Sequence, residues 1–341
     1  MEKFNILIEA KPFCVFNNSP LEQLQSKGYN VINMRGSGID NPDFINALKT
    51  ADAVICGNEL RVDDALLQIG SNLEIIVKIG TGLDNIDLAA ATRNKVIVCN
   101  TPGKNKQAVA DHTFALILSV ARKILQCDQS LRERRWEHTQ ILCHEIWRKT
   151  IGILGLGAIG QNVALRATGF QMRIVAHDPV WPTAFAEEHA VERVTIEQLF
   201  AVSDIVTVHM PLQKETRGLV DKSYLSLMKP TALLINTARG AIIKEDELYD
   251  ALKNRAIAGA GIDVFETEPP MDSPLLDLDN VVLSPHTASF TYDSIHEMNV
   301  AAADQLIEFY NGVQPRYAVN REAFDHIKCL QVKTGKKAVT V

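Results

Sequence analysis

Three residues in the last third of the chain have side chains suited to acid–base chemistry on an anionic substrate. Arg239 follows an apolar run in TARG, Glu268 lies in FETEP, and His286 lies in SPHTA. A planar guanidinium suits a carboxylate, and an imidazole can donate a proton near neutral pH. Taken singly, Arg239 could pair with Glu245 at the surface and Glu268 could be a solvated turn residue.

A glycine-rich segment predicts a dinucleotide site. GLGAIG follows the apolar run IGIL and precedes the helical pattern QNVALRAT, which is the context that a dinucleotide fold requires. Asp178 follows at the end of the next apolar run, where an acid would accept hydrogen bonds from ribose hydroxyls and repel a 2′-phosphate. We therefore expect NAD rather than NADP as the cofactor. The expected contacts are Gly155, Gly157, Ala158, Ile159, Gly160 and Asp178.

Short β-rich runs alternate with helical patterns over most of the chain, which is typical of a parallel sheet. The first set of runs is 4–9, 29–34, 52–56, 73–80 and 96–100. The second set is 150–155, 171–178, 204–210, 232–238, 256–265 and 281–286. The pattern predicts an α/β protein with two doubly wound parallel-sheet lobes.

Two helical patterns indicate how the lobes are connected. The run 107–125 is apolar on more than one face, which favours a helix covered by another domain or subunit and predicts a homodimer. The run 292–310 is too short to fold alone, so we place it on the first lobe. The expected domains are 1–100 with 287–341, and 101–286. The tail from Lys328 lacks apolar periodicity and is expected to be loosely held.

Bulk composition excludes several classes of partner. The 341 residues carry a formal net charge of −6, which provides no basic field for nucleic acid. The six cysteines include no Cys-x-x-Cys pair, and the ligand-type residues near His144 fit no standard zinc spacing, so no metal is expected. We also expect no signal peptide, no membrane span and a cytoplasmic protein.

The motifs resemble those of a known family in both content and order. GLGAIG, HDP, VHMPL, INTARG, GIDVFETEP and SPHTA, preceded by KIGTGLDNID, are similar to the D-isomer-specific 2-hydroxyacid dehydrogenases over nearly the whole chain, and most to the phosphoglycerate dehydrogenase-like branch. The resemblance implies a Rossmann NAD-binding domain inserted in a flavodoxin-like substrate domain. It also implies that Asp263, Thr237 and Ala238 lie beside the cofactor, and that the turn at Thr81 and Gly82 donates to the substrate carboxylate.

Reduction of a 2-oxo acid would use Arg239, Glu268 and His286 together. Arg239 would hold the carboxylate and polarise the carbonyl, and His286 would protonate the alkoxide that forms as hydride reaches C2. Glu268 would raise the pKa of the His286 imidazole and orient the ring. The resemblance implies the same three roles.

Some alternatives remain open from the sequence. The enzyme could be a 3-phosphoglycerate dehydrogenase or a glyoxylate/hydroxypyruvate reductase, and a protein of another class, an NAD-sensing co-repressor-like scaffold, shares the fold and fingerprint. His209 could line the adenosine pocket or be structural. Lys78 and Lys106 could bind a second anionic group of the substrate, or their ammonium groups could extend outward to water.

Overall fold

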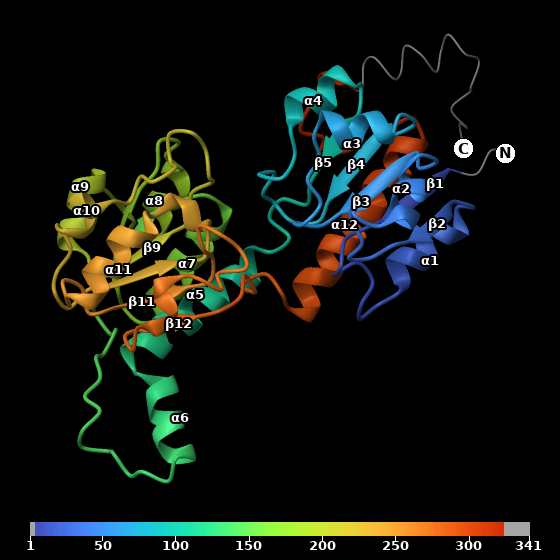
Figure 1. Ribbon diagram of the computed structural model, residues 1–341. Helices are drawn as coiled ribbons and strands as arrows, with labels where there is room; N and C mark the ends of the chain where they lie inside the picture. The colour runs from blue at the N-terminus through green and yellow to red at the C-terminus, as the bar shows by residue number, and fades with distance from the viewer. Residues whose placement is uncertain (1–3, 324–341) are drawn as a thin grey trace. The chain divides into compact units, whose positions relative to one another are not determined.

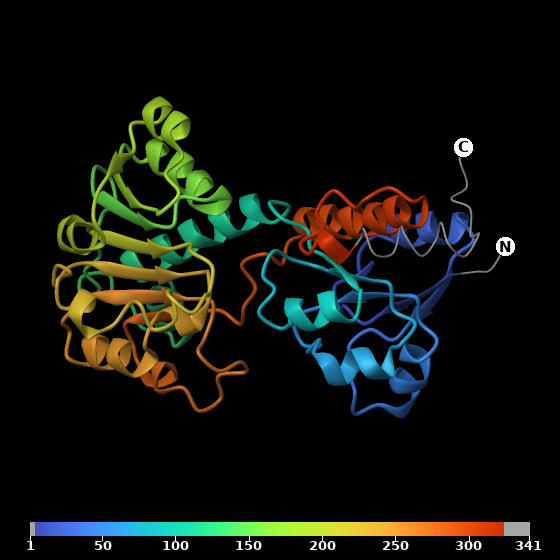
Figure 2. The same ribbon diagram turned by 90° about the horizontal axis from the view of Figure 1, so that it is seen from above.

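The computed structural model describes residues 4–323, and within them the chain forms two compact units. One unit comprises the chain up to Asn105 and from Thr291 onward, and the other is Lys106–Phe290. Each unit has a single sheet in which every strand pair is parallel, with helices on both faces (Figures 1 and 2). The tail from Lys328 lies outside the described residues.

The first unit has the flavodoxin-like strand order β2-β1-β3-β4-β5. Its strands are β1 (Asn5–Ile8), β2 (Asn30–Asn33), β3 (Ala53–Cys56), β4 (Ile75–Lys78) and β5 (Ile97–Cys99). Its helices are α1 (Ser19–Ser26), α2 (Pro42–Leu48), α3 (Asp64–Ile69), α4 (Leu88–Arg93) and α12 (Tyr292–Tyr310). Alternate strand residues pack on opposite faces: Ile6 contributes to the core under α1 and α12, and Leu7 to the core under α2, α3 and α4.

The second unit has the order β12-β11-β10-β9-β6-β7-β8, the Rossmann arrangement extended by one strand. Its strands are β6 (Thr150–Leu154), β7 (Arg173–His177), β8 (Glu192–Arg193), β9 (Ile205–Val208), β10 (Leu233–Asn236), β11 (Gly259–Ile262) and β12 (Val281–Leu283). Its α-helices are α5 (Lys106–Ala121), α6 (Ile124–Arg132), α7 (Ala158–Gly169), α8 (Thr183–Glu188), α9 (Ile196–Val202), α10 (Lys222–Leu225) and α11 (Glu245–Lys253). The 3₁₀ turn η1 (Gly240–Ile242) follows β10, and the 3₁₀ turn η2 (Pro274–Asp277) precedes β12.

The prediction of one helix over 107–125 covered by another domain or subunit is wrong in two respects, namely where the helix ends and what packs against it. α5 ends at Ala121, Lys123 adopts a left-handed conformation with φ 49°, and α6 begins at Ile124. Phe114 and Ile117 of α5 pack into the core of their own unit, against α7, β10 and β11. The apolar faces of α5 therefore need no second subunit to bury them.

Two further features were not visible in the sequence. β8 has only two residues, both exposed and charged, so it gives no apolar pattern. α6 projects from its sheet, and the following segment returns as a long loop (Figure 1). Among the described residues, no helix has both the length and the apolar character needed to span a membrane.

Candidate active site

The glycine-rich turn between β6 and α7 is shaped to receive a diphosphate. Gly155 has φ 99°, and a Cβ added there would lie 2.8 Å from the His209 backbone. A Cβ on Gly160 would lie 2.1 Å from the Gly155 carbonyl oxygen, so helix and turn could not approach as they do. A Cβ added to Gly157, by contrast, would meet no atom of another segment within 4 Å. The turn therefore leaves open space at the N-terminus of α7, which fits a dinucleotide pyrophosphate.

Asp178 lies at the end of β7 and contacts this turn directly. Its Oδ2 accepts a hydrogen bond of 2.7 Å from the Leu156 backbone N–H, and its Oδ1 accepts one from Val180 N–H. The carboxylate thus orders the glycine turn. Ala158 and Ile159 form the first turn of α7.

Arg239 is positioned by the loop between β10 and η1. Buried Asn236 donates from Nδ2 to the Arg239 carbonyl and accepts from Ala238 N–H, which fixes the loop that carries the guanidinium. The next residue must be glycine, because a Cβ on Gly240 would lie 1.9 Å from the Phe265 carbonyl carbon. This close approach brings the loop after β10 against the loop after β11.

Glu268 and His286 form a hydrogen-bonded pair within the second unit. The Glu268 Oε2 lies 2.8 Å from His286 Nδ1, and Oε1 accepts from Phe265 N–H. Burial acts to raise the pKa of Glu268, but the hydrogen bond and charge of His286, the Phe265 N–H and the Arg239 charge outweigh it, so the pKa is lowered. The carboxylate is therefore ionised at neutral pH, and Nε2 of the ring has no hydrogen-bond partner among the described residues.

Asp263 holds the loop that carries His286. It is fully buried, and its carboxylate accepts from the Thr287 and Ala288 backbone N–H groups and from Ser284 Oγ, while its carbonyl accepts from His286 N–H. Burial opposes ionisation, but these donors and His112 lower the pKa of Asp263. His286 itself has φ 52°, a conformation that the surrounding hydrogen bonds sustain.

One member of this network, His112, is not indicated by any motif in the sequence. His112 of α5 lies 2.8 Å from Ser284 Oγ and 3.5 Å from Asp263 Oδ1. The nearest of these partners is more than 150 positions away, so no local pattern could reveal the contact. Thr237 is also tied to α5, because its Oγ1 lies 3.1 Å from the Thr113 hydroxyl.

His209 is not suited to be the proton donor. Burial lowers its pKa to about 3, so the ring is neutral at physiological pH. Its Nε2 lies 2.8 Å from Thr207 Oγ1, and its buried Nδ1 has no hydrogen-bond partner among the described residues. Of these two histidines, His286 alone has a carboxylate hydrogen-bonded to the ring.

The residues expected to bind substrate in the first unit follow β4. The backbone N–H groups of Thr81 and Gly82 donate to no described residue, whereas the neighbouring Gly80 N–H donates to Thr101 Oγ1. Lys78 is only 1% exposed, and its Nζ donates to Asn58 Oδ1 and to the Ile79 carbonyl. The alternative that the Lys78 ammonium extends to water is therefore wrong.

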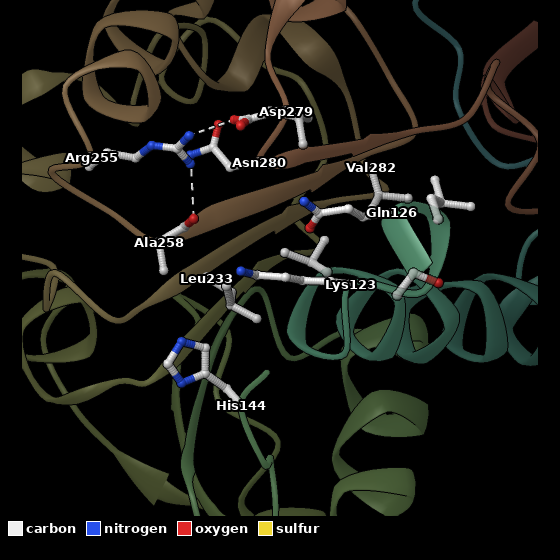
Figure 3. Close-up of a pocket in the computed structure, with 13 residues that line it drawn as sticks. Lys123, Gln126, His144, Leu233, Arg255, Ala258, Asp279, Asn280 and Val282 are labelled. Atoms are coloured by element: carbon white, nitrogen blue, oxygen red, sulfur yellow. Dashed lines mark hydrogen bonds and ion pairs between the residues drawn. The ribbon is translucent and has the colours of Figure 1, made fainter. Parts of the chain in front are cut away.

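A pocket of about 310 Å³ lies elsewhere on the second unit (Figure 3). It is lined by residues at the amino ends of β10 and β12, including Leu233 and Val281, and by the basic side chains of Lys123, His144 and Arg255. The catalytic candidates follow the carboxyl ends of the strands. The pocket is therefore separate from the acid–base residues.

Comparison with known proteins identifies the family. Residues 114–288 match the NAD-binding domain of the D-isomer specific 2-hydroxyacid dehydrogenases. The chain is 39% identical over 285 residues to the D-3-phosphoglycerate dehydrogenase of Archaeoglobus fulgidus, covering 83% of this chain and 54% of the relative. It is 40% identical over 284 residues to the glyoxylate reductase of Korarchaeum cryptofilum, covering 82% and 86% respectively.

The fold gives the same result. The D-lactate dehydrogenase of Aquifex aeolicus, solved with NAD and lactic acid, superposes with a TM-score of 0.81 at 26% identity, over 90% of this chain and 96% of that one. The chain spans about half the length of the Archaeoglobus phosphoglycerate dehydrogenase that it matches. The sequence resemblance, the NAD cofactor and the two-lobed α/β fold are thereby confirmed, and the chain belongs to the D-isomer specific 2-hydroxyacid dehydrogenase family.

Proposed function

We propose that the protein interconverts a 2-oxo acid and its D-2-hydroxy acid with NAD as cofactor. The observation that carries the proposal is the 2.8 Å contact between Glu268 and His286, together with Arg239 close enough to lower the pKa of Glu268. When bound in the second unit, NADH would supply the hydride for C2. Arg239 holds the substrate carboxylate and polarises its carbonyl, and His286 transfers its Nε2 proton to the oxygen as the C–O double bond becomes a single bond.

The remaining cofactor contacts follow the fingerprint. Gly155, Gly157 and Gly160 would admit the pyrophosphate, and Asp178 would accept hydrogen bonds from the adenosine ribose. Thr237, Ala238 and Asp263 would line the nicotinamide side. For Asp263 the proposal includes a second task, because its carboxylate already accepts hydrogen bonds from the loop that carries His286.

A panel of 2-oxo acids tests the proposal most simply. NADH consumption should be measured with glyoxylate, hydroxypyruvate, 3-phosphohydroxypyruvate, pyruvate and larger 2-oxo acids. Turnover of at least one of these supports the enzyme. Absence of turnover with all of them, with NADH still bound, would favour the co-repressor-like scaffold instead.

We assign substrate binding to the first unit, through the Thr81 and Gly82 backbone N–H groups. A relative of which this chain covers 86% is named as a glyoxylate reductase, which keeps that activity beside the phosphoglycerate dehydrogenase alternative. We also propose that the Lys78 charge favours a substrate with a second anionic group. The panel decides this point, because equal efficiency with charged and uncharged side chains would contradict it.

We further propose that the protein is a homodimer. Large apolar residues are exposed on α6 and the loop that follows: Leu125, Leu131, Trp136, Leu142 and Trp147 are all more than half exposed. Such a concentration on one projecting segment favours a protein partner. The pocket of Figure 3 adjoins it through Leu125, and we propose that a second copy covers both. Sedimentation as a monomer at micromolar concentration would contradict the dimer.

A cytoplasmic location is the last part of the proposal. Cys14, Cys56 and Cys99 are buried free thiols, and burial raises the pKa of Cys14 to about 11 and that of Cys56 to about 12. Thiols kept protonated in this way suit a reducing compartment. Fractionation of the producing cells would test it.

A further inference from the structure

The loop 266–273 between β11 and η2 carries Glu268, and one carboxylate contacts both of its ends. The Glu266 backbone N–H donates to Glu245 Oε2 at 3.1 Å, and the Ser273 hydroxyl donates to Glu245 Oε1. Each oxygen of Glu245 therefore binds one end of the loop. An ionised carboxylate accepts hydrogen bonds more strongly than a neutral group, so these contacts are suited to closing the loop.

Glu245 is itself held on a rigid element. It is the first residue of α11, and the next turns of this helix bury Leu248 and Leu252 in the core of the unit. An acidic residue in the first helical turn is also favoured by the helix dipole. The carboxylate is thus fixed to the core while the loop it contacts has no regular structure of its own.

We propose that Glu245 is a positioning residue for the proton donor. By holding the Glu266 and Ser273 ends of the loop, it keeps the Glu268 carboxylate on His286 Nδ1, and so it acts through Glu268 rather than on substrate. The inference rests on the proposed function. It gives Glu245 a task other than the surface pairing with Arg239 considered from the sequence.

Glu247 provides a matched control in the same helical turn. Its Oε2 accepts from the Lys222 backbone N–H at the start of α10, and its Oε1 lies 3.2 Å from Lys244 Nζ. It is partly buried like Glu245 and also anchors a neighbouring backbone, but it does not contact the loop 266–273. If the loss of any acidic residue from the first turn of α11 were enough to lower activity, substitution of Glu247 and of Glu245 would have the same effect.

The test compares Glu245→Ala with Glu247→Ala in the full chain. For Glu245→Ala we expect kcat to fall about 10- to 100-fold, the scale of a misplacement near 1 Å, with NADH affinity unchanged. The pH above which reduction fails should also move down, because the Glu268 carboxylate would no longer be held on His286 Nδ1. Glu247→Ala should keep the wild-type pH profile. Ser273→Ala, which frees one end only, should shift the profile less and in the same direction.

A double-mutant cycle separates action through Glu268 from other routes. In a Glu268→Gln background, Glu245→Ala should cause little further loss, because the carboxylate it positions is already gone. Additive losses, or a wild-type pH profile in Glu245→Ala, would overturn the proposal. If Glu245→Ala fails to fold, Glu245→Gln replaces it, since an amide keeps one acceptor oxygen but loses the second.

A readout independent of turnover keeps this inference distinct from the proposed function. Amide hydrogen exchange in 266–273 should rise in Glu245→Ala and not in Glu247→Ala. Unchanged amide exchange would refute the proposed role of Glu245 in holding the loop, even in an active enzyme. Increased exchange in a protein that reduces none of the 2-oxo acids would support that role and refute the proposed dehydrogenase function.

Discussion

The two sheets present charged residues at their carboxyl edges in opposite ways. In the second unit, the side chains of His286 and Glu268 are 29% and 37% exposed. In the first unit, Glu9 and Lys78 at the corresponding ends of β1 and β4 are 2% and 1% exposed. The same architecture therefore supports an accessible acid–base pair in one unit and buried opposite charges in the other.

The pKa values of the Glu9 and Glu268 carboxylates shift in opposite directions. Burial raises the pKa of Glu9, which the Gly57 N–H and the Lys78 charge offset only in part. For Glu268 the donors outweigh burial and the pKa is lowered. Access to solvent and substrate allows His286 to exchange protons, whereas Lys78 can act only through its charge and the shape it gives the turn at Gly80. Proton transfer should belong to the second unit alone.

The largest expected effect comes from removing the proposed catalytic side chains of the second unit. His286→Ala or Arg239→Ala should lower kcat by about 10²- to 10⁴-fold, the range for a general acid, while NADH affinity stays nearly intact. Stopped-flow turnover and fluorescence titration with NADH measure the two quantities. Arg173→Ala, which loses a surface ion pair with Glu192, is the control. Activity lost only in proportion to NADH binding would assign both residues to the cofactor instead.

The buried charges should matter mainly for stability. Lys78→Met removes one of the two lysine charges, Lys78 and Lys11, that offset the burial of Glu9, and it leaves Asn58 Oδ1 without its Lys78 donor. We expect a loss of about 3–5 kcal/mol in the free energy of unfolding. Lys106→Met, at a partly exposed site, should change it by less than about 0.5 kcal/mol. Denaturant unfolding checks both, and the double variant Glu9→Gln/Lys78→Met should recover part of the loss. Equal stability of Lys78→Met and Lys106→Met would contradict the claim that the buried charges of the first unit contribute mainly to stability.

A smaller effect is expected at the cofactor. Asp178→Ala should narrow the preference for NADH over NADPH by about tenfold, since it removes both a ribose acceptor and the repulsion of a 2′-phosphate. Because Asp178 also accepts from Leu156 N–H, affinity for NADH should weaken at the same time. The ratio of kcat/KM for the two cofactors measures the change. A wild-type enzyme that already prefers NADPH would contradict this assignment.

The sequence predicts those features that depend on local pattern. Apolar runs bounded by turns locate the strands, and α12 begins and ends where the helical pattern 292–310 does. The break at Lys123 was missed because Ile124 and Leu125, the first residues of α6, extend the apolar run of α5 across it. At the site, motif order indicates Arg239, Glu268 and His286. The contacts of His112 and Glu245 depend on how α5 and α11 meet loops that are distant in sequence, and no spacing along the chain records them.

The central claim is that Glu268 keeps His286 competent to donate its proton, and its direct test is the pH dependence of reduction. With the 2-oxo acid that the panel selects, kcat/KM should be measured from about pH 5 to pH 10 for wild type and Glu268→Gln. Glutamine removes the negative charge that is hydrogen-bonded to the His286 ring, so reduction should fail at a lower pH than in the wild type. An identical pH profile in the two proteins would contradict the account.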